Sequence, residues 1–151
     1  MTPRDAAPAG TDTGDGYSEI LLDHFRNPRN AGRLDDADGV GVAKAGECGD
    51  VMRIAIGVRD DHIRRIAFQC KGCPAAIACG SMTTELALGR HLDDAATIAD
   101  ETVASALGGL PPDKRHCSNL GAEALENAIM DYVVRSVERE RRGAGEAARN
   151  G

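Results

Sequence analysis

The chain has 151 residues, of which 28% are charged and only 3% are aromatic, and it contains no tryptophan. A chain of this length suits one domain, whose core must come mainly from Ala, Val, Ile, Leu and Met. The net charge of −6 excludes the basic surface that nucleic acid or an anionic membrane would attract. Because no apolar run approaches the roughly 18 residues of a transmembrane helix, we expect a cytoplasmic protein without membrane contact.

The two ends of the chain lack the patterns of folded structure. Residues 1–16 are rich in Pro, Gly, Thr and Asp and have no hydrophobic periodicity, which predicts a disordered tail. They also lack the apolar segment of a presequence. The periodic segments all fall within residues 17–138, which we predict to form the folded domain. Beyond them the apolar face is lost, which predicts a frayed tail over 139–151.

The periodic segments predict helices and strands in a definite order. Residues 17–25 have helical spacing and predict a short helix that ends before Pro28. Three segments with the alternation of strands follow, at 39–45, 50–58 and 62–70. Further helices are expected at 74–89, in two short pieces over 92–109, and from about 118 to 139. The sequence therefore predicts an α+β fold, in which four to five helices cover one face of a three-stranded antiparallel sheet.

Five cysteines stand in this acidic chain, at Cys48, Cys70, Cys73, Cys79 and Cys117. An odd number without an export signal favours thiols for metal or sulfur chemistry over a disulfide framework. Cys48 follows the first strand, Cys73 lies between the third strand and the next helix, and Cys117 precedes the last helix. Because strand ends and helix starts meet at one edge of such a sheet, these three thiols are expected to converge. A helix N-terminus beside Cys73 and Cys117 would favour the thiolate.

Two other side chains extend this set. Asp50 lies two residues beyond Cys48, across Gly49, and His116 directly precedes Cys117. Taken alone, Asp50 is typical of a turn residue and His116 of an exposed loop. Beside three candidate thiol ligands we interpret both as metal ligands, and either can be the fourth.

The remaining cysteines and histidines have simpler interpretations. Cys79 lies among small residues in a helix and Cys70 shares a strand face with apolar residues, so both are interpreted as packing residues. The spacing of Cys70 and Cys73 is also a CxxC, a weak sign of thioredoxin-like redox chemistry. His24 is expected to be a hydrogen-bonded core residue. The other two histidines, His62 and His91, are expected to be solvated.

Several segments, in order, resemble one known family. They are DHFRNPRNAG at 23–32, CGDVMRI at 48–54, GCPAAIA at 72–78, LPPDKRHCS at 110–118 and the final helix. Over about four-fifths of its length the chain resembles the iron-sulfur cluster assembly scaffolds of the IscU and NifU N-terminal domain type. The resemblance implies a SufE/NifU-like fold. It also implies a scaffold or carrier function rather than an enzyme in the turnover sense.

The same resemblance assigns roles to individual residues. Cys48, Cys73 and Cys117 match the scaffold cysteines, and Asp50 and His116 match the other ligands of the family. These side chains would hold a labile [2Fe–2S] cluster built from iron and persulfide sulfur, and zinc can occupy the same ligands. Cys117 matches the persulfide acceptor. The implied partners are a cysteine desulfurase and the apo-proteins that receive the cluster.

The chemistry of the ligands agrees with a transient cargo. Four thiolates typically retain an iron-sulfur cluster, whereas three thiolates with a carboxylate or imidazole leave a weaker corner. The same ligands satisfy tetrahedral zinc. An alternative function is therefore a zinc-dependent, SufU-like sulfurtransferase that relays persulfide from a desulfurase. A purely structural zinc domain is a third alternative, which the well-formed core disfavours.

Two features depart from the family pattern. Cys70 is not one of its usual ligands, and it could serve as an extra thiolate or form a protective disulfide. The segment Leu110–Lys114 matches the one gripped by an Hsp70-type chaperone, but it carries Asp113. Burying that carboxylate in an apolar groove is costly, which argues against dependence on the chaperone.

Overall fold

The structure is a computed structural model that describes residues 16–45 and 49–150, with side chains described as far as Gly143. The predicted tail over 1–16, apart from Gly16, and the candidate ligand Cys48 lie outside the described residues. The elements are α2 (Glu19–Arg26), β1 (Gly39–Lys44), β2 (Val51–Arg59), β3 (His62–Lys71), α3 (Pro74–Ala87), α4 (Leu92–Ala95), α5 (Asp100–Ala106), a 3-10 turn η1 (Pro112–Lys114) and α6 (His116–Asn150). Within these ranges no helix is long and apolar enough to cross a membrane.

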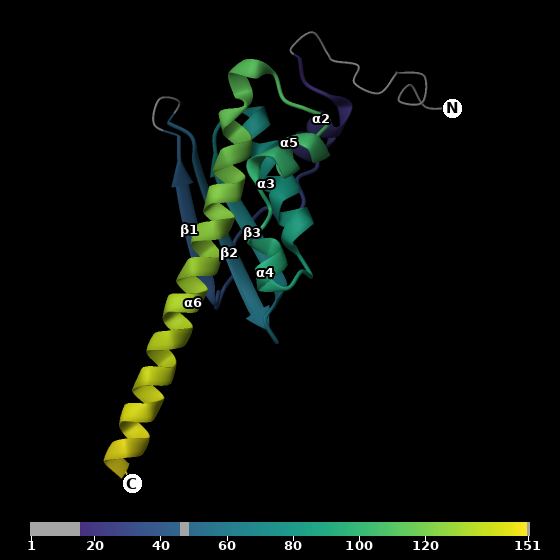
Figure 1. Cartoon of the computed structure of the whole chain (residues 1–151). Coiled ribbons are helices and arrows are strands. Elements are labelled where there is room, and N and C mark those ends of the chain that lie inside the picture. Colours follow the sequence, from purple (N-terminus) through teal and green to yellow (C-terminus); the bar gives the residue numbers. More distant parts are fainter. Residues whose placement is uncertain (1–15, 46–48, 151) are drawn as a thin grey trace.

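The three strands form one antiparallel sheet in the order β1-β2-β3. The predicted α+β fold is confirmed, since the helices pack on one face of this sheet (Figure 1). Met52, Ile54 and Ile56 alternate along β2 and are fully buried beneath the helices. On the other face the Arg53 guanidinium donates a hydrogen bond to the side-chain oxygen of Gln69 on β3.

The long helix α6 lies against β1 and β2, and glycines on β1 permit its close approach. A Cβ added to Gly41 would lie 2.2 Å from the carbonyl oxygen of Ala124 and from the amide nitrogen of Ala128. Any side chain at Gly41 would therefore push the helix away. The contact continues along the helix, where Asn127 donates a hydrogen bond of 3.0 Å to the carbonyl oxygen of Val42.

The C-terminal end of α6 differs from the sequence-based prediction. Fraying was predicted from residue 139, but the helix continues to Asn150 and projects beyond the sheet (Figure 1). The prediction followed the loss of the apolar face. Residues 138–142 are Glu and Arg, however, which have high intrinsic helix propensity and maintain a helix without an apolar face. Oppositely charged Glu138 and Arg142, four residues apart, add to this preference.

A buried histidine joins α2 to α3. His24 is buried, and its Nδ1 lies 2.8 Å from the hydroxyl oxygen of Ser81 in a hydrogen bond. The same hydroxyl oxygen accepts a hydrogen bond from the amide of Arg29, so its proton is free to be donated to His24. Burial, followed by the charge of Arg29, lowers the pKa of His24, which is consistent with a neutral ring that accepts this bond. The prediction of a hydrogen-bonded core histidine is confirmed.

The other two histidines differ from their prediction. His62 and His91 are half-buried and pack edge to face, with ring centroids 5.2 Å apart. A bridge between their backbones brings the rings together. They were expected to be solvated because charged residues flank them in the sequence. The sequence did not reveal this contact because His62 and His91 are far apart along the chain and meet only where the start of α4 lies beside β3.

Candidate metal centre

The loop before β2 presents a buried carboxylate. Gly49 has a φ of 71°, a conformation that glycine adopts without strain, and Asp50 follows it. Two backbone hydrogen bonds join the described residues on either side: the amide of Ala45 donates to the carbonyl oxygen of Asp50, at 2.9 Å, and the amide of Gly49 donates to that of Ala45, at 3.1 Å. The Asp50 side chain is only 7% exposed.

The second component of the site is at the start of α3. Cys73, which was predicted to lie near the N-terminus of this helix, is its N-cap residue, and Pro74 begins the first turn. The Sγ atom of Cys73 lies 3.8 Å from the Sγ atom of Cys117. Two thiols separated by 44 positions in the sequence are thereby in contact.

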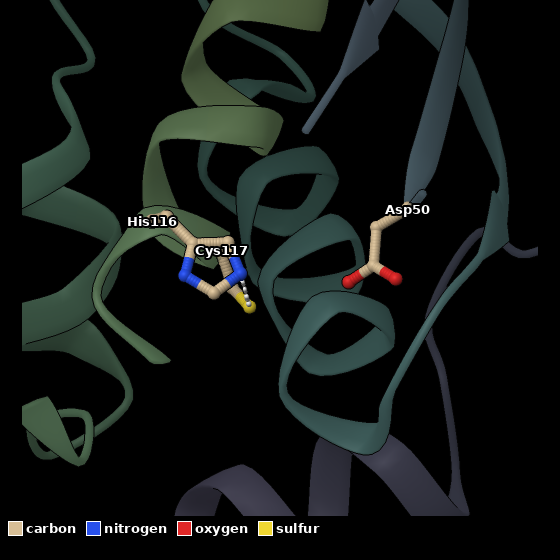
Figure 2. A group of neighbouring side chains, drawn as sticks. All are labelled: Asp50, His116 and Cys117. Atoms are coloured by element: carbon tan, nitrogen blue, oxygen red, sulfur yellow. Dashed lines mark hydrogen bonds between the residues drawn. The ribbon is translucent and has the colours of Figure 1, made fainter. Parts of the chain in front are cut away.

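The start of α6 completes the cluster of donors. His116 and Cys117 are its first two residues, so the helix begins two residues earlier than predicted. The Nε2 atom of His116 lies 3.6 Å from the Sγ atom of Cys117. One ligand atom from each of Asp50, His116 and Cys117 lies within 4.8 Å of the others. Figure 2 shows the imidazole and the thiol facing the carboxylate.

Four of the five predicted ligands therefore lie at one edge of the sheet: Asp50, Cys73, His116 and Cys117. They provide two thiols, one imidazole and one carboxylate, a set that suits zinc or an iron-sulfur centre better than a hard cation such as Mg²⁺. Cys48, the fifth, is outside the described residues, and its position as a ligand stays a prediction.

Gly72 contributes to the site through the space that it leaves. A Cβ added there would lie 2.8 Å from the carboxyl carbon of Asp50 and 3.0 Å from its Oδ2 atom. The carboxylate of Asp50 thus occupies the volume that a side chain at residue 72 would fill. The only sign of this role in the sequence is a glycine in the turn before Cys73.

The thiol of Cys117 is inaccessible and strongly protonated. Cys117 is 0% exposed. Burial raises its pKa to about 12, with the neighbouring Cys73 and Asp50 acting in the same direction and Lys114 opposing them. The sequence-based expectation of a thiolate favoured by the helix N-terminus is therefore wrong for Cys117 in these protein surroundings. Coordination to a metal would reverse the preference, because a bound cation favours the thiolate.

Two further residues act electrostatically on the thiols, and the sequence-based interpretation missed both. Burial, then the charge of Cys73, raises the pKa of Tyr17, which lies directly before the N-cap residue of α2. The charge of Cys73, then that of Tyr17, raises the pKa of Lys114. A hydroxyl and an ammonium group thus interact electrostatically with the pair of thiols.

The remaining two cysteines are less reactive than an ordinary thiol. Burial, followed by the nearby Asp50, raises the pKa of the half-buried Cys70 to about 11. Burial raises the pKa of Cys79, which is fully inside α3. This agrees with the interpretation of both as packing residues.

Comparison with known proteins gives the class of the chain. Residues 16–139 match the family described as the NifU-like N terminal domain. The chain belongs to this family, as the resemblance in its motifs indicated. The match includes all the strands and the packed part of α6.

Several relatives have established names. The chain is 54% identical over 116 residues to "Iron-sulfur cluster assembly scaffold protein IscU 1" of Archaeoglobus fulgidus, covering 77% of this chain and 76% of the relative. It is 45% identical over 120 residues to "Iron-sulfur cluster assembly scaffold protein IscU" of Escherichia coli, covering 77% and 93%. A NifU-like N-terminal protein from Brucella abortus has the same fold, with a TM-score of 0.60, 21% identity and coverage of 76% and 92%.

Proposed function

We propose that this protein is a scaffold on which a labile iron-sulfur cluster, of the [2Fe–2S] type, is assembled and then passed to apo-proteins. It acts as a carrier and not as an enzyme. The observation that carries the proposal is the convergence of Asp50, His116 and Cys117 within 4.8 Å, with the Cys73 sulfur 3.8 Å from that of Cys117. The scaffold names of relatives at 45% to 54% identity support it.

The mixed ligands suit a cluster that must leave. Thiolates are soft ligands that hold iron and sulfide well, while a carboxylate is a harder ligand and binds such a centre less firmly. Asp50 is the weak ligand in this proposal, and His116 is its alternate at the same corner. Cys73, Cys117 and Cys48 are the firm ligands.

Sulfur loading requires local movement. We assign Cys117 as the acceptor of persulfide sulfur from a cysteine desulfurase, yet its thiol is 0% exposed. The segment leading into α6, which contains η1 (Pro112–Lys114), is short and has no buried residue. It is the part of the site that can open at least cost, because few contacts hold it. Docking of the desulfurase would expose Cys117 in this way.

The test is anaerobic reconstitution with ferrous iron, cysteine and a cysteine desulfurase. We expect visible absorption from a cluster, a [2Fe–2S] signature by Mössbauer spectroscopy, and transfer of the cluster to an apo-ferredoxin. The Cys73→Ser and Cys117→Ser variants should form little or no cluster, while Cys79→Ala should form it normally. Persistent failure of the wild-type protein to form any cluster would falsify the proposal.

Zinc at the same ligands is the second expectation. Two thiols with an imidazole and a carboxylate also satisfy tetrahedral zinc, so the purified protein is expected to contain zinc that the cluster displaces. A zinc-dependent sulfurtransferase would behave differently: it would stimulate the desulfurase, lose this effect when zinc is removed, and never form a cluster. Measuring both activities on one preparation separates the two functions.

A further inference from the structure

The outer face of α6 carries apolar side chains that the fold does not cover. Met130, Val133, Val134 and Val137 are 59%, 43%, 46% and 41% exposed. Their spacing of three, one and three residues places them on one stripe of the helix. A stripe of this kind on a solvated helix indicates a binding surface more often than a chance arrangement.

The stripe points away from the sheet. The buried residues of the helix, among them Ala124 and Ala128, lie on its opposite side. Farther along, the carboxylate of Asp131 accepts a hydrogen bond of 2.8 Å from the amide of Val40, and Arg135 donates to the carbonyl oxygen of Ala37 at 3.2 Å. The side of α6 that faces β1 is thus fixed as far as Arg135, and the stripe is open to an approaching molecule.

Opposite charges stand at the two ends of the stripe. Glu126 precedes Met130 by four residues and Arg141 follows Val137 by four, so both lie on the same face of the helix. Both side chains are exposed. Among the ion pairs within 4.0 Å between described residues, none includes Glu126 or Arg141. Along the helix, this face is therefore first negatively charged, then apolar and then positively charged.

We propose that this face, residues 126–141 of α6, binds a second copy of the chain in antiparallel orientation about a two-fold axis. Only an antiparallel copy presents the reverse order of charges, positive, apolar, negative. In this register Glu126 lies opposite the partner's Arg141, and Val133 opposite the partner's Val134. Each contact occurs twice, as the symmetry of a two-fold interface requires.

A cleft beside the stripe provides further complementarity. It has a volume of about 510 Å³ and lies between α6 and the region of α4 (Leu92–Ala95). Val133 and Val137 form part of its lining, together with Leu92 and Ala96. In the antiparallel register the partner's Met130 lies opposite Val137, at the edge of this cleft. The flexible side chain of methionine suits the apolar part of this cleft, whose lining also includes the polar side chains of Asp61 and Asp93.

The arrangement leaves both metal centres accessible. Cys117 is about 17 residues from the two-fold axis, which at about 1.5 Å per residue is roughly 25 Å along the helix. The two centres would then lie at opposite ends of the dimer, roughly 50 Å apart. Each copy could meet a desulfurase or a recipient protein without displacing the other. Four apolar residues per copy bury less area than the roughly 800 Å² per partner of a standard interface, so the dimer is expected to be weak.

The test measures the monomer–dimer equilibrium by analytical ultracentrifugation over a wide range of concentrations. Reductant and chelator exclude disulfide-linked and metal-linked dimers. The wild type should dimerise reversibly, and Val134→Glu should weaken the dimer at least tenfold, about 1.4 kcal/mol. Leu88→Glu is the matched control, since Leu88 is similarly exposed, at 42%, but lies on α3's C-cap; it should leave the equilibrium unchanged.

Charge reversal tests the register. Glu126→Arg and Arg141→Glu should each weaken the dimer, because each creates two like-charged contacts, and the double variant should restore it. A protein that stays monomeric at every concentration overturns the proposal, as does equal weakening by Leu88→Glu and Val134→Glu. A double variant as weak as the single ones overturns the antiparallel register. Val134→Glu should still assemble a cluster, so failure of the dimer is distinguishable from failure of the scaffold.

Discussion

The two halves of α6 use the same kinds of residue for opposite purposes. Residues 116–129 begin at the metal centre and pack small side chains against Gly41 and its neighbours on β1. Residues 130–150 also begin with an apolar run, but that run faces outward and the helix projects beyond the sheet (Figure 1). An apolar helix face is thus not by itself a sign of core. What decides is whether the sheet lies beneath it.

Because of this difference, the first half of α6 is rigid and the outer face of the second half is accessible. The first half is fixed by the sheet, which keeps His116 and Cys117 in register with Asp50 and Cys73. The second half contacts β1 and the segment before it as far as Arg135, and its outer apolar face is available for association. Substitutions at both ends of the helix test this difference.

The largest effect concerns the reactivity of Cys117, in the first turn of the packed half. Burial and the neighbouring Cys73 hold its pKa well above the ordinary value, so the thiolate fraction at pH 7 is far smaller than that of an exposed thiol. In chelator-treated protein, alkylation of Cys117 should therefore be more than a hundredfold slower than in the urea-unfolded chain, the control. Mass spectrometry of the labelled peptides measures the rate. Equal rates in the two states would show that the start of α6 is open.

The second effect compares two glycines, one beneath each half. Gly41→Val would place side-chain atoms where the backbone of α6 now lies, and should destabilise the fold by about 3 kcal/mol. At Gly143, in the projecting half, a Cβ meets nothing within 4 Å. Gly143→Ala should instead leave the free energy of unfolding within about 0.5 kcal/mol of the wild-type value, because Gly143 is exposed. Urea unfolding monitored by circular dichroism measures both, and a similar loss in the two variants would contradict the comparison.

The sequence predicted what depends on local pattern. The alternation in β2 and the helical spacing around His24 identified strands, helices and one buried histidine correctly. Each pattern follows directly from which side chains of that segment are buried. The family motifs identified Asp50, Cys73, His116 and Cys117 as a set. The kinds of ligand atom were predictable in the same way, because sulfur, imidazole nitrogen and carboxylate oxygen follow directly from the residue types.

What could not be predicted depends on contacts between distant segments. The burial of Cys117, which opposes the effect of its helix N-terminus, arises where the start of α6 meets Cys73 at the start of α3 and Asp50 before β2. The space that Gly72 leaves for Asp50 depends on how two loops meet. The continuation of α6 beyond residue 138 was missed because the prediction followed amphipathicity, whereas the Glu and Arg residues at 138–142 favour helix without an apolar face.

The third effect tests the weak ligand at the centre. Asp50→Ala leaves only thiolates and an imidazole to hold the cargo, so the cluster should persist longer and transfer more slowly, by about tenfold. Gly72→Ala should act in the same direction, because its Cβ displaces the Asp50 carboxylate. The decay of visible absorption and the rate of transfer to an apo-ferredoxin measure the change. Gly143→Ala, distant from the centre, is the control, and an unchanged lifetime in Asp50→Ala would refute the role of a weak ligand.

The smallest effect comes from removing the end of the projecting half. A chain that ends at Glu138 lacks residues 139–151, of which those with described side chains, 139–143, are exposed. Deleting exposed residues without buried contacts should change the free energy of unfolding by no more than about 0.5 kcal/mol. Cluster assembly should be unaffected, because every described ligand lies upstream. The dimer should weaken, however, since Arg141 is lost. A loss of stability as large as that from Gly41→Val would mean that the projecting half is part of the core, and the two halves of α6 would then not differ as described.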